Sequence, residues 1–275
     1  MSVVFGVKGR LGNALFRYLA TSLFSIKYNL KYKIQDNINC IITDSTFIDW
    51  IEKDKQNILP NINRNLNYLF NGYYQHDIIY RKYKKDILDY INKNKDHYVL
   101  TDGINAGDGN YQKFYLKDIV NTPNNFNKYY NTVLHIRLED RVHIFKYINN
   151  KKVMTTVTIE PIKKIINKIN FTNNSCIVMK KPNSNFEKEF LSELIHYIKD
   201  KKNIDINIES NDILTDFHIM KNAETLVCSV STLSWCAALL SDKIKKCYMP
   251  DYPKEINENG KCKKPIDNTE LYDYN

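Results

Sequence analysis

Apolar and polar positions in the second half of the chain switch repeatedly between two patterns. Short apolar runs, such as 132–137 and 176–180, are typical of strands buried on both faces. Between them lie stretches with a helical period, of which 185–201 is the most regular because Phe190 and Leu194 fall in register. The pattern predicts strands at 132–137, 176–180, 204–208, 225–230 and 246–249, and helices at 160–169, 185–201, 212–222 and 232–241. This alternation predicts an α/β fold, a parallel sheet covered by helices on both faces.

The first half of the chain gives a weaker pattern. A β-branched run at 3–7 ends in a glycine-containing turn, and a helix with leucines every fourth position follows it. From 30 to 125 the chain is polar and rich in Asn, and single elements cannot be assigned. The Pro- and Asn-rich stretch 121–131 is typical of a linker. We therefore expect an N-terminal α/β domain over 1–125, a C-terminal α/β domain over 126–252 with a cleft between the two, and a loosely held polar tail over 253–275.

Composition limits the class of protein but says little about function. The 275 residues suffice for one large or two modest domains, and the 43% hydrophobic and 26% charged residues exclude a collagen, a coiled-coil rod and a wholly disordered chain. The net charge of +9 favours an anionic partner, such as nucleic acid, anionic lipid or a phosphorylated small molecule. The chain is also rich in Asn, Lys, Ile and Tyr, the residues of A/T-rich codons, so part of this charge reflects codon bias.

Cysteine spacing and apolar stretches bear on the cellular compartment. The six cysteines form no C-x-x-C pair, so we expect no zinc site, and Cys176 and Cys228 lie in apolar runs typical of reduced core cysteines. The longest uncharged stretch, 225–241, is shorter than the roughly 18–20 apolar residues of a membrane span. The N-terminal apolar run is too short for a signal peptide, so we expect a soluble, cytoplasmic protein.

The first stretch with candidate chemistry is 9–13, between the first strand and its helix. Gly12 and Asn13 lie where a backbone can approach a ligand closely and where a helix N-terminus attracts anions. The pattern is not G-x-G-x-x-G, so the dinucleotide fingerprint is absent. The simpler interpretation is a tight turn with Asn13 as the helix cap.

The second stretch, 135–140, ends the strand that opens the second half. Alternation places His135, Arg137 and Glu139 on one face of this strand. Arg137 would be a fixed bidentate donor suited to a pyrophosphate, at the end of a strand where α/β sheets bind ligands. The alternative is a structural salt bridge between Arg137 and Asp140.

The third stretch joins a helix containing Asp216 to a strand and a hydroxyl-rich turn. Ser231 and Thr232 lie where the next helix begins, so their hydroxyls and the free backbone N–H groups can hold a phosphate. The alternative is an ordinary Ser/Thr helix cap. Trp235 and Leu239 are predicted to be core residues.

Four segments occur in the order of the motifs of a known family. Residues 9–20 are similar to its G-G/R-L-G-N-Q-M-F-Q-Y-A segment, and 72–76 are similar to G-Y-F/W-Q-S. Residues 135–140 are similar to H-x-R-R-G-D, and 216–220 with 230–236 are similar to D-F-x-x-M and N-S-T-F-S-W-W. By these motifs the chain resembles the α-1,2-fucosyltransferase family and, more distantly, the protein O-fucosyltransferases.

The resemblance implies a GT-B-like fold, two Rossmann-like domains facing a cleft. It implies an inverting, metal-independent glycosyltransferase that moves L-fucose from GDP-fucose onto a glycan hydroxyl, with no other cofactor. The residues that it implies at the donor are His135, Arg137, Asp216, Ser231, Thr232, Gly12 and Asn13. On the acceptor side they are Tyr73, Gln75 and His76, and in catalysis Arg137, Asp140, Glu139 and Asn13. Candidates for the general base are Asp140, Glu139 and His76, in that order.

The chain departs from the family pattern at several motif positions. Leu138 and Glu139 occupy the positions where the pattern has Arg and Gly. Val230 replaces the Asn of the pattern, Cys236 replaces its second Trp, and Ala14 replaces its Gln. These departures leave other donors open, namely GDP-rhamnose or a UDP- or dTDP-sugar. Two alternatives of another class are a non-catalytic polyanion or nucleic-acid binder and a decayed transferase that binds its ligand without turnover.

Overall fold

Contacts between residues divide the chain into two compact units, residues 1–123 and 124–275. The boundary lies inside the Asn-rich stretch 121–131. The computed structural model describes residues 2–5, 10–32, 40–55, 61–63, 66–94, 96–102, 111–139, 142–148, 151–251 and 264–273.

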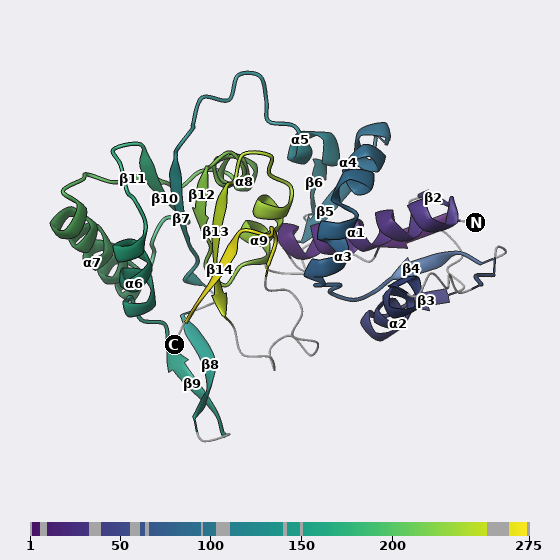
Figure 1. The fold of residues 1–275 in the computed structure, drawn as a ribbon, viewed down its shortest axis with the longest axis horizontal. Helices are drawn as coiled ribbons and strands as arrows, with labels where there is room; N and C mark the ends of the chain where they lie inside the picture. Colours follow the sequence, from purple (N-terminus) through teal and green to yellow (C-terminus); the bar gives the residue numbers. More distant parts are fainter. Residues whose placement is uncertain are drawn as a thin grey trace. The chain divides into compact units, whose positions relative to one another are not determined.

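The first unit contains a four-stranded parallel sheet in the order β2-β1-β4-β3 (Figure 1). Its elements in chain order are β1 (Ser2–Phe5), α1 (Leu11–Tyr28), β2 (Lys31–Tyr32), β3 (Cys40–Ile42), α2 (Asp44–Lys55), β4 (Tyr68–Phe70), α3 (Asp77–Lys82), α4 (Lys84–Lys93), β5 (Tyr98–Asp102), β6 (Tyr111–Tyr115) and α5 (Leu116–Val120). Strands β5 and β6 pair separately as an antiparallel ribbon. The helix predicted after the first strand is confirmed as α1.

Aromatic side chains form much of the core of the first unit. Phe24 of α1 lies with its ring centroid 5.6 Å from that of Trp50 and 5.4 Å from that of Phe70. The indole of Trp50 is buried, and its Nε1 donates a hydrogen bond of 2.6 Å to the hydroxyl of Tyr28. The bond satisfies a polar group that burial would otherwise leave unpaired. These contacts fix α1 and α2 against the sheet.

The second unit contains a six-stranded sheet, in the order β11-β10-β7-β12-β13-β14, with all neighbours parallel. Its elements in chain order are β7 (Thr132–Ile136), β8 (His143–Ile148), β9 (Lys151–Thr156), α6 (Glu160–Lys168), β10 (Ser175–Met179), α7 (Asn185–Lys202), β11 (Asn207–Glu209), α8 (Ile213–Lys221), β12 (Thr225–Val227), α9 (Thr232–Leu239), β13 (Lys246–Asp251) and β14 (Thr269–Asp273). Counted from β7, this is the order 3-2-1-4-5-6 of the doubly wound Rossmann sheet. The prediction of an α/β fold with a parallel sheet is confirmed.

Helices cover both faces of this sheet. Leu134 and Ile136 of β7 belong to a core cluster that includes Leu194 and Ile198 of α7 and several isoleucines of α6. The helix α8 contacts β7 and β10 and packs against α9, and Figure 1 places this pair across the sheet from α6 and α7. Because successive strand residues point to opposite faces, His135 of β7 faces away from the α6–α7 cluster.

Two features of the second unit differ from the sequence predictions. An antiparallel hairpin, β8–β9, is inserted between β7 and α6, and its base is closed by the hydrogen bond of 2.8 Å from the Val157 N–H to the Val142 carbonyl. Several strands are also displaced or shorter than predicted, since β11 spans 207–209 and β12 ends at 227.

The prediction of a loosely held polar tail over 253–275 is wrong for residues 269–273. These residues form β14, the edge strand of the sheet, in parallel register with β13. Tyr272 is buried, and its hydroxyl donates a hydrogen bond of 2.6 Å to the carbonyl of Cys228. Thr269 and Tyr272 are the buried residues of this short segment, with Glu270 and Leu271 between them, so its pattern does not alternate clearly enough to indicate a strand. Residues 253–263, 274 and 275 of the predicted tail lie outside the described residues.

The cysteines expected in the core are buried. Cys176, Cys228, Cys236 and Cys247 are each buried and form no disulfide with a described residue, and the sulfurs of Cys228 and Cys247 are 3.9 Å apart. Burial raises the pKa of Cys236, so its thiol stays protonated. Within the described ranges, no helix is both long and apolar enough to cross a membrane.

Candidate functional site

Two of the predicted stretches meet at the carboxyl edge of the six-stranded sheet. Strands β7 and β12 are parallel neighbours with Leu134 opposite Val227, so the segments that follow these two strands leave the sheet at the same edge. Connections from β7 and β12 run to opposite sides of the sheet, which makes this the topological switch point. The Nδ1 of His135 and the Oγ of Ser229 are 2.9 Å apart and share a hydrogen bond. This bond ties the second predicted stretch to the third.

His135 is buried and uncharged at neutral pH. Burial, with a further contribution from the charge of Arg137, lowers its pKa to about 3. Its ring therefore offers no positive charge to a phosphate. Its role in the described structure is to hold Ser229, and with it the start of the turn that leads into α9.

The residues after β7 keep the predicted alternation. Leu138 is buried in the core cluster with Ile136, whereas Arg137 and Glu139 are half-buried. The buried position of Leu138 explains why an apolar residue is suited to a place where the family pattern has an arginine. Asp140 lies outside the described residues, and so does the proposed salt bridge between Arg137 and Asp140.

The turn after β12 leads into the N-terminus of α9. Ser231 is the N-cap of α9, and its Oγ accepts a hydrogen bond of 3.2 Å from the N–H of Leu233. Thr232 is the first residue of the helix and is half-buried. The cap uses the hydroxyl of Ser231 as an acceptor, which leaves its O–H able to donate to an anion. Trp235 and Leu239 are buried, which confirms them as core residues.

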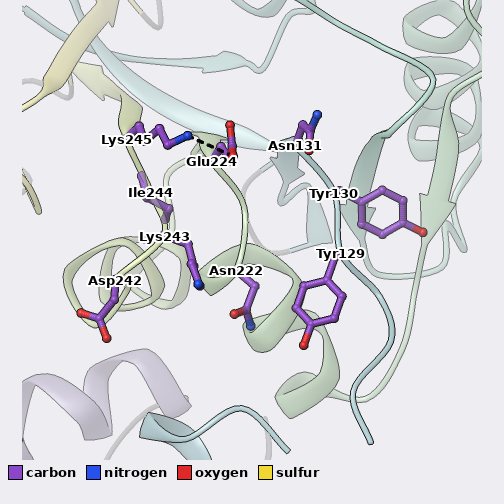
Figure 2. Close-up of a pocket in the computed structure, with 9 residues that line it drawn as sticks. All are labelled: Tyr129, Tyr130, Asn131, Asn222, Glu224, Asp242, Lys243, Ile244 and Lys245. Carbon is purple, nitrogen blue, oxygen red and sulfur yellow. Dashed lines mark hydrogen bonds and ion pairs between the residues drawn. The ribbon is translucent and has the colours of Figure 1, made fainter. Parts of the chain in front are cut away.

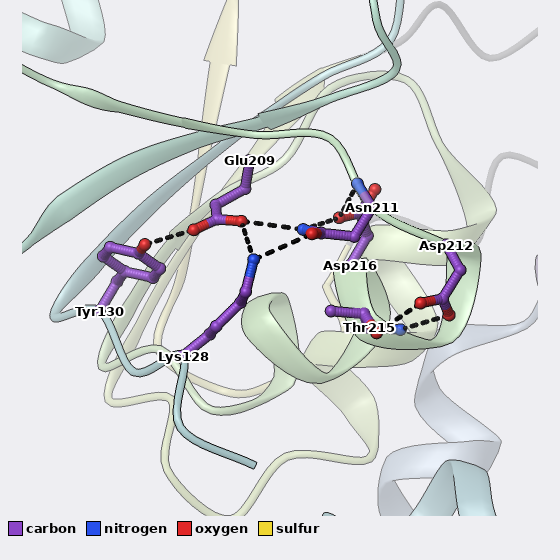
Figure 3. A network of polar contacts seen from close by, with 7 residues as sticks. All are labelled: Lys128, Tyr130, Glu209, Asn211, Asp212, Thr215 and Asp216. Atoms are coloured by element: carbon purple, nitrogen blue, oxygen red, sulfur yellow. Dashed lines mark hydrogen bonds and ion pairs between the residues drawn. The ribbon is translucent and has the colours of Figure 1, made fainter.

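Asp216 lies at the same edge of the sheet but in a separate network, shown in Figure 3. Its Oδ1 accepts hydrogen bonds from the backbone N–H of Asn211 at 3.1 Å and from its side-chain amide at 3.0 Å. Glu209 accepts from Lys128 at 2.7 Å, from Asn211 at 2.9 Å and from the hydroxyl of Tyr130. Asp216 lies after β11, and the strands β10 and β7 lie between β11 and β12 in the sheet. No hydrogen bond among the described residues joins Asp216 to the switch-point residues.

Burial sets the charge state of this acidic group. It raises the pKa of Asp216 to about 6, with the hydrogen bonds of Asn211 acting in the opposite direction and the charges of Asp212 and Glu209 adding to the rise. Asp212 is the N-cap of α8, where it accepts from the N–H groups of Leu214 and Thr215. In the described structure Asp216 therefore has a structural role at the start of α8, where it accepts hydrogen bonds from Asn211.

Two lysines that the sequence reasoning did not single out follow β10 directly. Lys180 and Lys181 come after Met179, the last residue of that strand, and both are exposed. The register pairs Met179 with Ile136, so β10 and β7 end together. The signal for them was available in the sequence as two cations at the end of a buried apolar run. Their importance depends on the strand order, which the sequence does not give.

In the first unit, the first predicted stretch meets the 72–76 segment. The side-chain amide of Gln75 donates to the Oδ1 of Asn13 at 3.4 Å. Asn13 is the third residue of α1, and Arg10 is the N-cap, so the interpretation of Asn13 as a helix cap is wrong. Gly12 is buried in the first turn of the helix. The contact arises because β1 and β4 are parallel neighbours whose carboxyl ends lie at one edge.

The 72–76 segment is a fixed turn with one exposed aromatic ring. Tyr74 adopts a left-handed conformation with φ of 52°, is fully buried, and donates from its hydroxyl to the carbonyl of Ile42. Tyr73 is 59% exposed, so a ligand can reach its ring. His76 is buried, and its ring lies 6.0 Å from that of Phe47. Of the three predicted acceptor-side residues, Tyr73 and Gln75 are the accessible ones.

A pocket of about 530 Å³ lies at the opposite, amino edge of the six-stranded sheet (Figure 2). Its lining residues come from segments that precede β7, β12 and β13, and they are Tyr129, Tyr130, Asn131, Asn222, Glu224, Asp242, Lys243, Ile244 and Lys245. The Nζ of Lys245 forms an ion pair of 3.0 Å with Glu224. None of the residues predicted from the sequence lines this pocket. Ligands of α/β sheets bind at the carboxyl edge, so the pocket is not the leading candidate site.

Comparisons with protein-family models, with curated proteins and with solved structures find no match for this chain. In the part of the chain that the structure describes, no three His, Cys, Asp or Glu side chains are grouped so that they could hold a metal ion.

Proposed function

We propose that this chain is an inverting glycosyltransferase that transfers a sugar, most simply L-fucose from GDP-fucose, onto a glycan hydroxyl. The observation that carries the proposal is the meeting of two separate sequence stretches at the switch point of a Rossmann-like sheet. The hydrogen bond between His135 and Ser229 joins the chain after β7 to the chain after β12. Open α/β sheets bind their ligands in the crevice outside the strands at such a point.

The groups near this edge suit a departing nucleoside diphosphate. When the bond between the anomeric carbon and the phosphate oxygen breaks, the electron pair stays on the diphosphate and its negative charge increases. Arg137 is a permanent cation whose planar donors match phosphate oxygens. The N–H groups at the start of α9 add partial positive charge, and Ser231 and Thr232 add hydroxyl donors. Interactions that strengthen as this charge develops lower the barrier to transfer.

Inversion also requires a base for the acceptor hydroxyl. The hydroxyl oxygen attacks the anomeric carbon from the face opposite the diphosphate, and its proton passes to a carboxylate or imidazole within hydrogen-bond reach. Asp140 and Glu139, three and two residues after Arg137, remain the leading candidates. His76 is less suited because its side chain is buried.

We propose the GT-B arrangement for the two units, with the first unit on the acceptor side. The parallel sheet of the first unit supports this, because Asn13 and Gln75 meet at its carboxyl edge. The exposed ring of Tyr73 offers a surface on which a sugar can stack.

A thermal-shift panel with GDP, GDP-fucose, GDP-mannose and UDP- and dTDP-sugars tests the proposal. A ligand at 100 times its Kd should raise the free energy of unfolding by about 2.7 kcal/mol. We expect GDP-fucose to stabilise the protein, Arg137→Ala to abolish the shift, and the exposed Lys243→Ala, at the amino edge, to leave it unchanged. A shift with another sugar nucleotide would identify that nucleotide as the donor and leave the proposed site unchanged. No shift with any nucleotide, together with steeply salt-dependent binding of nucleic acid, would favour the polyanion binder instead.

A further inference from the structure

The strand register brings a pair of lysines beside the switch-point arginine. Met179 of β10 lies opposite Ile136 of β7, so the next residues along the two strands are Lys180 and Arg137. On the other side of β7, β12 carries the chain into the N-terminus of α9. Three neighbouring strands thus lead into Lys180 with Lys181, into Arg137 and into the Ser231 cap at one edge of the sheet.

Hydrogen bonds and ion pairs among the described residues do not account for the charge of these two lysines. Both are exposed, and neither ammonium group forms a hydrogen bond or an ion pair with any residue that the structure describes. Lys180 does lie close enough to Glu187 to help lower the pKa of that carboxyl. Lys128, in contrast, forms an ion pair of 2.7 Å with Glu209. Exposed charges that no ion pair in the described residues occupies are available to a ligand.

The backbone that carries the lysines is held in place. Ser184 and Glu187 form a capping box at the start of α7, in which the Oε2 of Glu187 accepts from the N–H groups of Asn183 at 2.8 Å and of Ser184 at 3.0 Å. Pro182 restricts the backbone immediately after the lysines. The turn from β10 into α7 therefore presents Lys180 and Lys181 from a fixed position, while their side chains stay free to follow a ligand.

We propose that Lys180 and Lys181 bind the diphosphate of a nucleoside diphosphate held at the switch point, together with Arg137. The proposal rests on the proposed use of a sugar nucleotide. Two adjacent phosphates carry about three negative charges at neutral pH, which Arg137 and two lysines balance. The lysines add point charges without strict geometry, whereas the arginine fixes the orientation. They hold the diphosphate before transfer and stabilise it as the leaving group.

Calorimetric binding of GDP, inorganic pyrophosphate and guanosine to the full chain tests this proposal. The test variant is Lys180→Ala/Lys181→Ala. Its control is Lys201→Ala/Lys243→Ala, which removes the same charge from two exposed lysines at the amino edge of the sheet. We expect the test variant to weaken GDP and pyrophosphate binding about tenfold or more at about 0.15 M salt, and the control to change it less than about twofold. Guanosine binding should be the same in all three proteins.

A third variant, Lys180→Arg/Lys181→Arg, controls for a folding defect, because it should restore binding to within about threefold of the parent. Equal binding of GDP by the parent and the test variant would overturn the role of the lysines and leave the proposed function in place. Equal losses in the test and control variants would also overturn it, since they would reflect net charge alone. A parent that binds neither GDP nor pyrophosphate would refute both proposals. A parent that binds GDP through these lysines but transfers no sugar would refute the transfer reaction alone.

Discussion

Replacement of Asp216 by Asn separates the structural role of this carboxyl from a role in binding the donor. Burial raises its pKa from the ordinary value of 3.8 to about 6, because the ionised form is poorly solvated beside α8. A group whose pKa is raised on folding stabilises the protein fully below its unfolded pKa, and this contribution is lost as the pH rises through the folded value. Ionised Asp216 therefore costs stability at pH 7.5, and the neutral amide of the variant would not.

The magnitude follows from the shift in pKa. A rise from 3.8 to about 6 corresponds to about 3 kcal/mol if the carboxyl were fully buried. The side chain is only half-buried, so solvent screening reduces this to about 1.5 kcal/mol. The negative charge in the first turn of α8 also interacts favourably with the helix N-terminus, by about 0.3–1 kcal/mol. We therefore expect the free energy of unfolding of the variant, relative to that of the parent, to increase by about 1 kcal/mol as the pH rises from 4.5 to 7.5.

Urea unfolding at several pH values measures this difference. The free energy of unfolding of Asp216→Asn, minus that of the parent, should increase from pH 4.5 to 7.5. The matched control is Asp212→Asn on the same helix. Burial raises the pKa of Asp212, but hydrogen bonds from Thr215 and Leu214 outweigh it and lower the pKa overall, below its ordinary value of 3.8. The stabilisation from this carboxylate is therefore nearly complete by pH 4.5, so Asp212→Asn should be less stable than the parent by an almost constant amount from pH 4.5 to 7.5.

A stability difference that is independent of pH would refute the reasoning for Asp216. A normal pH trend combined with at least tenfold weaker binding of GDP would assign Asp216 a direct role at the donor as well.

Three further predictions concern the contacts that position the site. Ser229→Ala should lower the free energy of unfolding by about 1–3 kcal/mol in urea at pH 7, because it leaves the buried nitrogen of His135 without its partner, and a parental stability would contradict the hydrogen bond. Glu209→Gln should cost about 1–2 kcal/mol at pH 7, and the cost should shrink as the pH falls through the lowered pKa of this carboxyl; a cost that stays constant down to pH 3 would argue against its ion pair. Ser184→Ala should cost about 1 kcal/mol in thermal unfolding followed by circular dichroism, and an unchanged Tm would show that the capping box contributes nothing.

The sequence was most informative where strands are buried on both faces. Short apolar runs such as 132–137 and 176–180 indicate strands buried on both faces, and the structure has such strands there. The helix between Asn185 and Lys202 repeats its apolar positions regularly. The parallel α/β architecture of the second unit could therefore be predicted. The hairpin β8–β9 could not, because its pattern is short and nothing in it marks a departure from the sheet.

The edge strand β14 was missed for a different physical reason. An edge strand in a parallel sheet needs few buried residues, and this one is held by Thr269 and Tyr272 against β13 and Cys228. The first unit is a similar case, since β2 has two residues and β3 and β4 have three each. Its core depends on aromatic contacts between elements far apart in the sequence, which no local pattern reveals.

For the candidate site, the sequence identified residue types but not their neighbours. His135 and Ser229 are 94 positions apart, and only the strand order places them together. The same order separates Asp216 from them by placing β11 at the edge of the sheet. It also gives Lys180 a place beside Arg137 that spacing along the chain does not indicate.

Hydrogen–deuterium exchange in the presence and absence of GDP-fucose tests the central claim most directly, because it locates the bound ligand on the chain. The account predicts slower exchange in peptides that follow β7, β10 and β12, which contain Arg137, Lys180 and Ser231. The amino-edge segments 222–224 and 242–245 should exchange at unchanged rates. Protection confined to those amino-edge segments, which line the pocket in Figure 2, would contradict the account and move the binding site to the other edge of the sheet.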